Sequence, residues 1–137
     1  MPRFVRRLVI ALVVLLAIQL VPVTRDNPPD RRGPAAPPQV EAVLKRACYD
    51  CHSNETVWPW YSHVAPMSWL VAYDVHQGRK HFNLSDFQDL SPETAAKVRA
   101  KAIEEVEAGE MPLFFYVPLH PAAKLTDADK AVIKTWK

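Results

Sequence analysis

The sequence predicts an all-α fold, and three observations support this prediction. Glycine is scarce, with three residues among 137, whereas proline is abundant, with thirteen. No strong run alternates apolar and polar β-branched residues, which would be the usual signal of a half-buried strand. Apolar residues instead recur at helical spacing, in segments that prolines separate. We therefore expect helices joined by proline-stiffened loops, with room for one domain of ordinary size.

The amino-terminal segment is typical of an export signal. Three arginines, Arg3, Arg6 and Arg7, precede an apolar run over residues 8–23. Positive charge before such a run holds the amino-terminal end in the cytoplasm and directs the rest of the chain outward. We expect residues 1–23 to form a membrane-anchor helix, because no small-x-small cleavage motif lies near its end. A cleaved signal peptide is the alternative, since the run is shorter than the ~20 residues that span a bilayer comfortably.

A proline-rich linker is expected over residues 24–39, where five prolines and several charges leave little to bury. Charge is also uneven along the chain. Residues 1–39 hold six basic and two acidic side chains, whereas residues 40–137 hold eleven basic and thirteen acidic ones. A nucleic-acid-binding protein would gather lysine and arginine on its folded part, so we expect no nucleic-acid partner.

The folded domain is expected over residues 40–137. Its first helix should run from near Pro38 to about Cys51 and bury one face. That apolar face consists of Val40, Val43, Leu44, Ala47, Cys48 and Cys51. Pro66 can open a second helix, which Gly78 would close. A short capped turn is expected at a serine followed three residues later by glutamine, namely Ser85 and Gln88.

The third helix has the clearest signals. Ser91 is suited to the N-cap, Pro92 to the first helical position, and Glu93 to the positive end of the helix dipole. Gly109 would end this helix. Its apolar stripe consists of Ala95, Val98, Ala102 and Val106.

A long loop over residues 110–125, with three prolines, precedes the last helix. Thr126 and Asp129 form a capping box, so this helix should begin at about Asp127 and run to the end of the chain. Its inward-facing residues would be Val132, Ile133 and Trp136. A loop of such length in a small domain usually has a functional role, and we expect it to cover a site.

The chemistry-bearing motif is Cys48-Tyr49-Asp50-Cys51-His52, the Cys-x-x-Cys-His signature of c-type haem attachment. Residues three apart on a helix share one face, so both cysteines can reach the two vinyl groups of one porphyrin edge. His52 comes directly after and can bind the iron. Its other ring nitrogen is expected to donate to a backbone carbonyl, which fixes the tautomer.

Three other readings of the cysteine pair are weaker. A thioredoxin-like dithiol would need a βαβ setting, which the sequence does not predict. A zinc site would usually need a second cysteine pair, and the chain has only two cysteines. A simple disulfide remains the plain structural alternative in an oxidising exterior.

With this motif the sequence resembles the cytochrome c superfamily, and more narrowly a family of small exported proteins with a haem-binding domain. The resemblance covers roughly residues 39–137. It rests on Cys-Tyr-Asp-Cys-His-Ser-Asn-Glu-Thr-Val-Trp-Pro-Trp-Tyr-Ser, then Ala-Pro-Met-Ser-Trp-Leu, and the later Gly-Glu-Met-Pro. It implies a cytochrome-c-like helical fold around one covalent haem c, and it leaves the biological role open.

Met111 is the candidate sixth ligand of the iron. It comes after a helix end at Gly109, begins the long loop, and precedes Pro112, which stiffens the approach. The cytochromes that the chain resembles place a methionine ligand in such a loop. Packing at the haem edge is the alternative role. Met67 is the next candidate, although a core role is simpler. Four histidines, each more simply read as a surface or hydrogen-bonding residue, could also ligate the iron: His63, His76, His81 and His120. Of these His120 is the strongest, because it shares the loop of Met111.

Aromatic residues after the motif, Trp58, Trp60 and Tyr61, have two readings. They are either ordinary core or a haem wall, with an indole N–H or phenol O–H donating to a haem propionate. Arg79 and Lys80 could also pair with a propionate, although a solvated role is simpler.

From these residues we expect a membrane-tethered, one-electron carrier on the outer, periplasmic face of a bacterial cytoplasmic membrane, and not an enzyme. A carrier of this kind exchanges its electron with another protein, so we also expect a redox partner protein. The alternatives are a haem-based sensor, in which a small ligand displaces Met111, and a peroxidase-associated haem module. Both require a distal site that opens to a small molecule.

Overall fold

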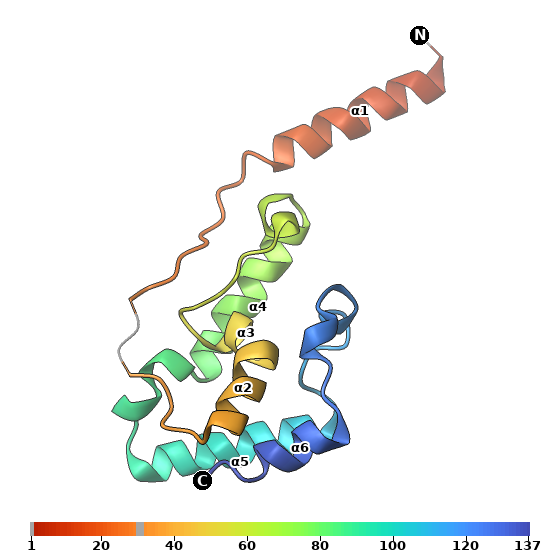
Figure 1. Cartoon of the computed structure of the whole chain (residues 1–137). Helices are drawn as coiled ribbons and strands as arrows, with labels where there is room; N and C mark the ends of the chain where they lie inside the picture. The colour runs from red at the N-terminus through yellow and green to blue at the C-terminus, as the bar shows by residue number, and fades with distance from the viewer. Residues whose placement is uncertain (1, 30–31) are drawn as a thin grey trace. The chain divides into compact units, whose positions relative to one another are not determined.

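The computed structural model describes residues 2–29 and 32–137 (Figure 1). Within these residues the structure is helical and contains no strand, so the all-α prediction is confirmed. The α-helices are α1 (Arg3–Ile18), α2 (Pro38–Ala47), α3 (Tyr49–His52), α4 (Met67–His81), α5 (Pro92–Ala108) and α6 (Asp127–Ile133). The 3-10 segments are η1 (Trp60–His63), η2 (Leu84–Asp89), η3 (Val117–Leu119) and η4 (Pro121–Ala123).

The chain divides into two compact units. The first combines the residues up to Asp26 with Trp58–Asp74, and the second combines Asn27–Val57 with Val75–Lys137. The Cys-x-x-Cys-His motif and the expected distal loop therefore both belong to the second unit.

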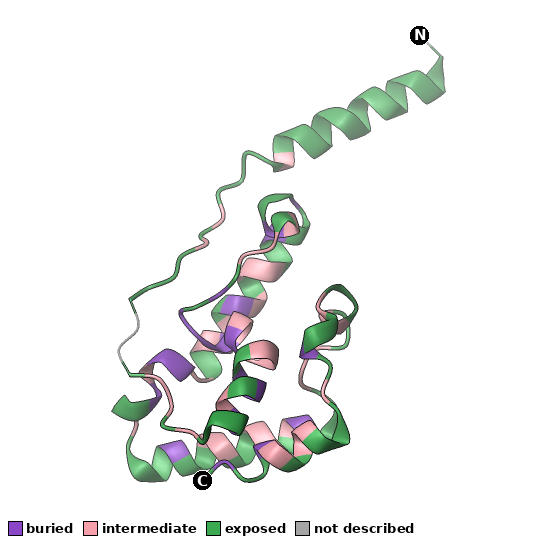
Figure 2. Cartoon of the chain, in the orientation of Figure 1, coloured by how far each residue is buried: buried purple, intermediate pink, exposed green. Residues whose placement is uncertain are grey.

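In the first unit, α1 covers most of the expected anchor segment but ends at Ile18. Almost all of its residues are exposed (Figure 2). A helix of this size rises about 24 Å, whereas the hydrocarbon core of a bilayer is about 30 Å thick. Among the helices that the structure describes, none has both the length and the apolar character needed to cross a membrane.

The first helix of the second unit is interrupted at the motif. The sequence pattern predicts one helix to about Cys51, but α2 ends at Ala47, and α3 begins at Tyr49. Cys48, between them, has a φ angle of −122°, outside the helical range. Its N–H still donates to the Leu44 carbonyl at 2.8 Å, and its own carbonyl accepts from the His52 N–H at 2.9 Å. Cys48 therefore lies at the junction of the two helices and Cys51 lies within α3, rather than both on one continuous helix.

The sequence suggested that Gly78 ends a helix, but α4 continues past it to His81. A Cβ atom at this position would lie 2.3 Å from the carbonyl oxygen of Cys51. Glycine in a helix interior is unfavourable by roughly 0.5–1 kcal/mol relative to alanine. Here it permits the close approach of α4 to the motif.

The segment before α2, where an extended linker was expected, is hydrogen-bonded to η2 through Arg32. The N–H of Arg32 donates to the Ser85 carbonyl at 2.9 Å, and the Arg32 carbonyl accepts from the Gln88 N–H at 3.2 Å. The Arg32 guanidinium also pairs with Asp89 at 2.7 Å. The cap of η2 is Asn83, whose side chain accepts from the Ser85 N–H, and not Ser85 itself.

The capping predictions for α5 and α6 are confirmed. The Ser91 hydroxyl accepts from the Thr94 N–H at 3.2 Å, and Gly109 ends α5 in the left-handed region with φ 78°. Thr126 and Asp129 form the expected capping box of α6. That helix ends at Ile133, a few residues before the end of the chain.

The core of the second unit forms where α2 packs against α6, α3 packs against η2, and α6 packs against α5. Its buried residues form two clusters, one of Val40, Leu44, Tyr49, Leu84, Phe87, Ala95 and Trp136, the other of Val43, Val106 and Ile133. Each buried leucine or isoleucine contributes about 1.5–3 kcal/mol to folding. Figure 2 shows buried positions in η2 and along α5.

Candidate functional site

A pocket of about 450 Å³ opens in the second unit beside the motif. This volume lies within the range of roughly 300–1,000 Å³ that ligand and cofactor sites usually have. The lining is mainly apolar, with a few polar side chains. Its residues are Ala47, Cys48, His52, His81, Phe82, Lys97, Val98, Lys101, Ala102, Glu105, Val106, Met111, Pro112 and Leu125.

His52 is held in one orientation at the wall of this pocket. It is 8% exposed, and its ring stacks on Phe82 with centroids 4.2 Å apart and planes at 13°. Its Nδ1 lies 3.4 Å from the Phe82 carbonyl oxygen, a long hydrogen bond in which the imidazole N–H must be the donor. Nε2 then carries the lone pair and is the ring nitrogen that can bind a metal.

Burial also sets the protonation states of the motif. It lowers the pKa of His52 below the usual 6.5, although the carbonyl oxygens of Phe82 and Gly78 act in the opposite direction. The imidazole is therefore neutral at pH 7, as a metal ligand must be. Burial raises the pKa of the Cys48 thiol to about 12, and the neighbouring Cys51 adds to this rise. A dithiol redox site needs a thiolate of low pKa, so this thiol does not fit that chemistry.

The two cysteines occupy different surroundings. Cys48 lines the pocket, whereas Cys51 lies against Gly78 of α4. The residues that the structure describes contain no disulfide, and no group of three or more His, Cys, Asp or Glu residues that could hold a metal ion.

Met111 lines the same pocket as Cys48 and His52. Its N–H donates to the Glu105 carbonyl at 3.2 Å, which fixes the start of the loop at the end of α5. Its side chain packs, partly buried, against the Val43, Val106 and Ile133 cluster. Met67, the other methionine considered, lies in the first unit and is 39% exposed.

Among the remaining histidines, His81 lines the pocket. His120 instead stacks on Tyr116, with centroids 3.9 Å apart, and its Nδ1 lies 3.2 Å from the Tyr116 carbonyl. Sequence reasoning ranked His120 above His81 because His120 shares the loop of Met111. Gly78 is the feature of the sequence that could have pointed to His81. A glycine within a helix can mark a place where another segment comes close, and here α4, which carries His81, comes close to the motif.

Two lysines on the pocket wall were also missed from the sequence. Lys97 and Lys101 lie one turn apart on α5 and line the pocket. Arg79, which the sequence suggested for a propionate, donates to the Ser53 carbonyl at 2.7 Å and to the Thr56 hydroxyl at 2.9 Å. Its guanidinium holds the loop after the motif in place.

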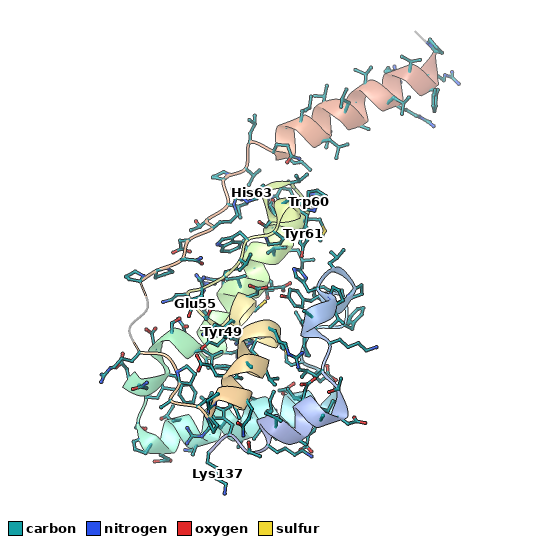
Figure 3. All side chains as sticks on the ribbon, viewed as in Figure 1. Tyr49, Glu55, Trp60, Tyr61, His63 and Lys137 are labelled. Carbon is teal, nitrogen blue, oxygen red and sulfur yellow. The ribbon has the colours of Figure 1, made fainter. Side chains whose placement is uncertain are left out.

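The aromatic residues after the motif belong to the first unit. Trp60 is 79% exposed, and its ring meets that of Tyr61 edge-on with centroids 5.8 Å apart (Figure 3). Trp58, Trp60 and Tyr61 are not among the residues that line the described pocket.

Comparisons with known proteins point to haem. Cytochrome c peroxidase of Escherichia coli (strain K12) is 30% identical over 97 residues, which cover 69% of this chain and 21% of that protein. The chain thus spans about a fifth of the length of this relative. No solved structure matches the chain. The model of the haem-binding domain family matches residues 13–137, and the chain therefore belongs to the haem-binding domain family.

Proposed function

We propose that this chain is a monohaem c-type cytochrome-like protein that transfers one electron at a time. One observation carries the proposal: Cys48, His52 and Met111, which are the attachment and ligand candidates, line one pocket. Cys48 and Cys51 would hold haem c through thioethers, and His52 and Met111 would ligate its iron. When bound, haem supplies an iron that exchanges one electron between its ferrous and ferric states.

The protein's own residues would set the properties of this site. The Phe82 carbonyl keeps His52 in the tautomer that presents Nε2. A methionine thioether as an iron ligand beside histidine would raise the reduction potential. The apolar side chains of α5 on the pocket wall limit solvent access, which also tunes the potential.

Two protein ligands on the iron would favour an electron carrier over an enzyme. If His52 and Met111 both ligated the iron, they would exclude a substrate from it, and Met111 would have to move away before a small molecule could bind. The electron must then pass to a redox partner protein.

An exported location is part of the proposal. Three arginines before an apolar segment support it, and the exposed apolar side chains of α1 suit a lipid surface. We place the haem domain on the periplasmic face of the cytoplasmic membrane, tethered by residues 1–23. Fractionation and amino-terminal sequencing of the mature protein test the tether, and recovery of a cleaved, freely released domain would contradict it.

The central test is to produce the full chain together with c-type haem maturation machinery. Mass spectrometry should show one haem added per chain, and replacing both motif cysteines by alanine should abolish the addition. The reduced protein should resist carbon monoxide. An intact disulfide between Cys48 and Cys51, in protein matured with haem available, would overturn the proposal.

A second candidate function is a haem module that works with a peroxidase. It is favoured by the similarity to a cytochrome c peroxidase, of which this chain matches about a fifth. Rapid mixing of the reduced protein with hydrogen peroxide distinguishes the candidates. Fast oxidation by peroxide, together with ready carbon monoxide binding, would favour an open, peroxidase-type or sensor site over a closed carrier.

A further inference from the structure

The aspartate inside the haem motif has three hydrogen-bonding roles. Asp50 Oδ1 accepts from the Val57 N–H at 3.0 Å, and its backbone carbonyl accepts from the Thr56 hydroxyl at 2.8 Å. Its second carboxylate oxygen, Oδ2, accepts from the hydroxyl of Tyr116 at 2.5 Å. The first two bonds are local, but the third joins residues 66 positions apart.

Tyr116 lies in the same loop as Met111, and the chain between them is short and constrained. The N–H groups of Tyr116 and Val117 both donate to the Leu113 carbonyl, at 3.0 and 3.4 Å, which closes a turn. The Tyr116 ring also stacks on His120. A hydrogen bond that holds Tyr116 therefore restricts the segment that begins at Met111.

The other side of the motif holds the far end of this loop. Arg46, two residues before Cys48, donates to the Ala122 carbonyl at 2.8 Å and forms an ion pair with Asp129 of α6. The motif segment thus holds the loop by hydrogen bonds at two residues, Tyr116 and Ala122. Of these, the Tyr116 bond is nearer in sequence to Met111.

We propose that Asp50 and Tyr116 are positioning residues that fix the 110–125 loop, whose two ends line the pocket, and so keep Met111 at its ligand position. This inference rests on the proposed function. A hydrogen bond to a carboxylate is among the stronger kinds in proteins. Losing it would make this loop conformation less stable relative to one in which Met111 has moved away from the pocket. A small exogenous ligand then competes more effectively for that position.

The test is an imidazole titration of the oxidised, haem-loaded full chain, followed by absorption. Tyr116→Phe removes only the hydroxyl and keeps the ring that stacks on His120. We expect it to raise the apparent affinity for imidazole about tenfold, which corresponds to about 1.4 kcal/mol. Tyr73→Phe is the matched control, because Tyr73 is 61% exposed and lies in the first unit, and it should leave the affinity unchanged.

A double variant separates positioning of Met111 from general loosening. Met111→Ala alone should bind imidazole tightly, and adding Tyr116→Phe to it should cause no further increase, because the competing ligand is gone. An unchanged affinity in Tyr116→Phe would overturn the inference, and so would an equal increase in the Met111→Ala background. If Met111→Ala leaves the near-infrared methionine–iron band intact, the proposed ligand itself falls, which is a separate outcome.

Discussion

Gly78→Ala should disturb the haem-attachment motif more than its size suggests. The added Cβ would lie 2.3 Å from the Cys51 carbonyl oxygen and 2.9 Å from its carbonyl carbon. The main chains of α4 and α3 would have to separate by about 1 Å to restore van der Waals contact. That displacement falls on one of the two cysteines that we propose to hold the haem.

The magnitude follows from two opposing terms. Overpacking of this kind costs typically about 1–3 kcal/mol. Replacing a helical glycine by alanine returns about 0.5–1 kcal/mol. The two terms leave a net loss of about 0–2.5 kcal/mol, and its midpoint of about 1 kcal/mol should lower Tm by roughly 4–8 °C for a domain of this size.

Thermal unfolding of the haem-loaded protein, followed by circular dichroism, measures this loss. Gly109→Ala is the control, because a Cβ there meets nothing within 4 Å and the substitution only strains a backbone with φ 78°. It should lower Tm but leave the yield of doubly attached haem unchanged, whereas Gly78→Ala should reduce both. A Gly78→Ala protein as stable as the parent, with full haem attachment, would refute the reasoning.

Three further predictions concern the ligand, the cap and the cofactor. Met111→Ala should abolish the near-infrared methionine–iron band and lower the reduction potential, because loss of the thioether favours ferric iron. Met67→Ala is the control and should leave the band and the potential unchanged. A redox titration followed by absorption spectra measures both. The pKa of Asp129 is lowered to about 2, chiefly by its bond to Arg46, so its carboxylate stabilises the fold above about pH 4, and this contribution is lost as the pH falls through 2. Asp129→Asn should flatten that part of a pH–stability profile, and an identical profile would contradict the assignment. Replacing both motif cysteines by alanine should leave a poorly folded chain, because cofactor burial stabilises the native state, and a cooperative melt equal to that of the loaded protein would count against this.

Part of the site depended on neighbours distant in sequence. The pattern predicted Cys48 and Cys51 on one helix, but the chain bends at Cys48, and α4 packs against Cys51 through Gly78. Likewise His120, favoured because it shares the loop of Met111, stacks on Tyr116, while His81 reaches the pocket. The packing of α4, rather than proximity to Met111 in the sequence, brings a histidine to this pocket.

The sequence by itself determined the features that depend on residues within a few positions of one another. The all-α class, the caps at Ser91 and Thr126 and the helix end at Gly109 are local, because each involves backbone groups within one turn. The haem motif is local in the same sense. The tertiary structure alone decided that Asp50 bonds to Tyr116 and that glycine is needed at residue 78. These contacts join segments whose separation along the chain carries no periodic or capping signal, so only the packed helices bring them together.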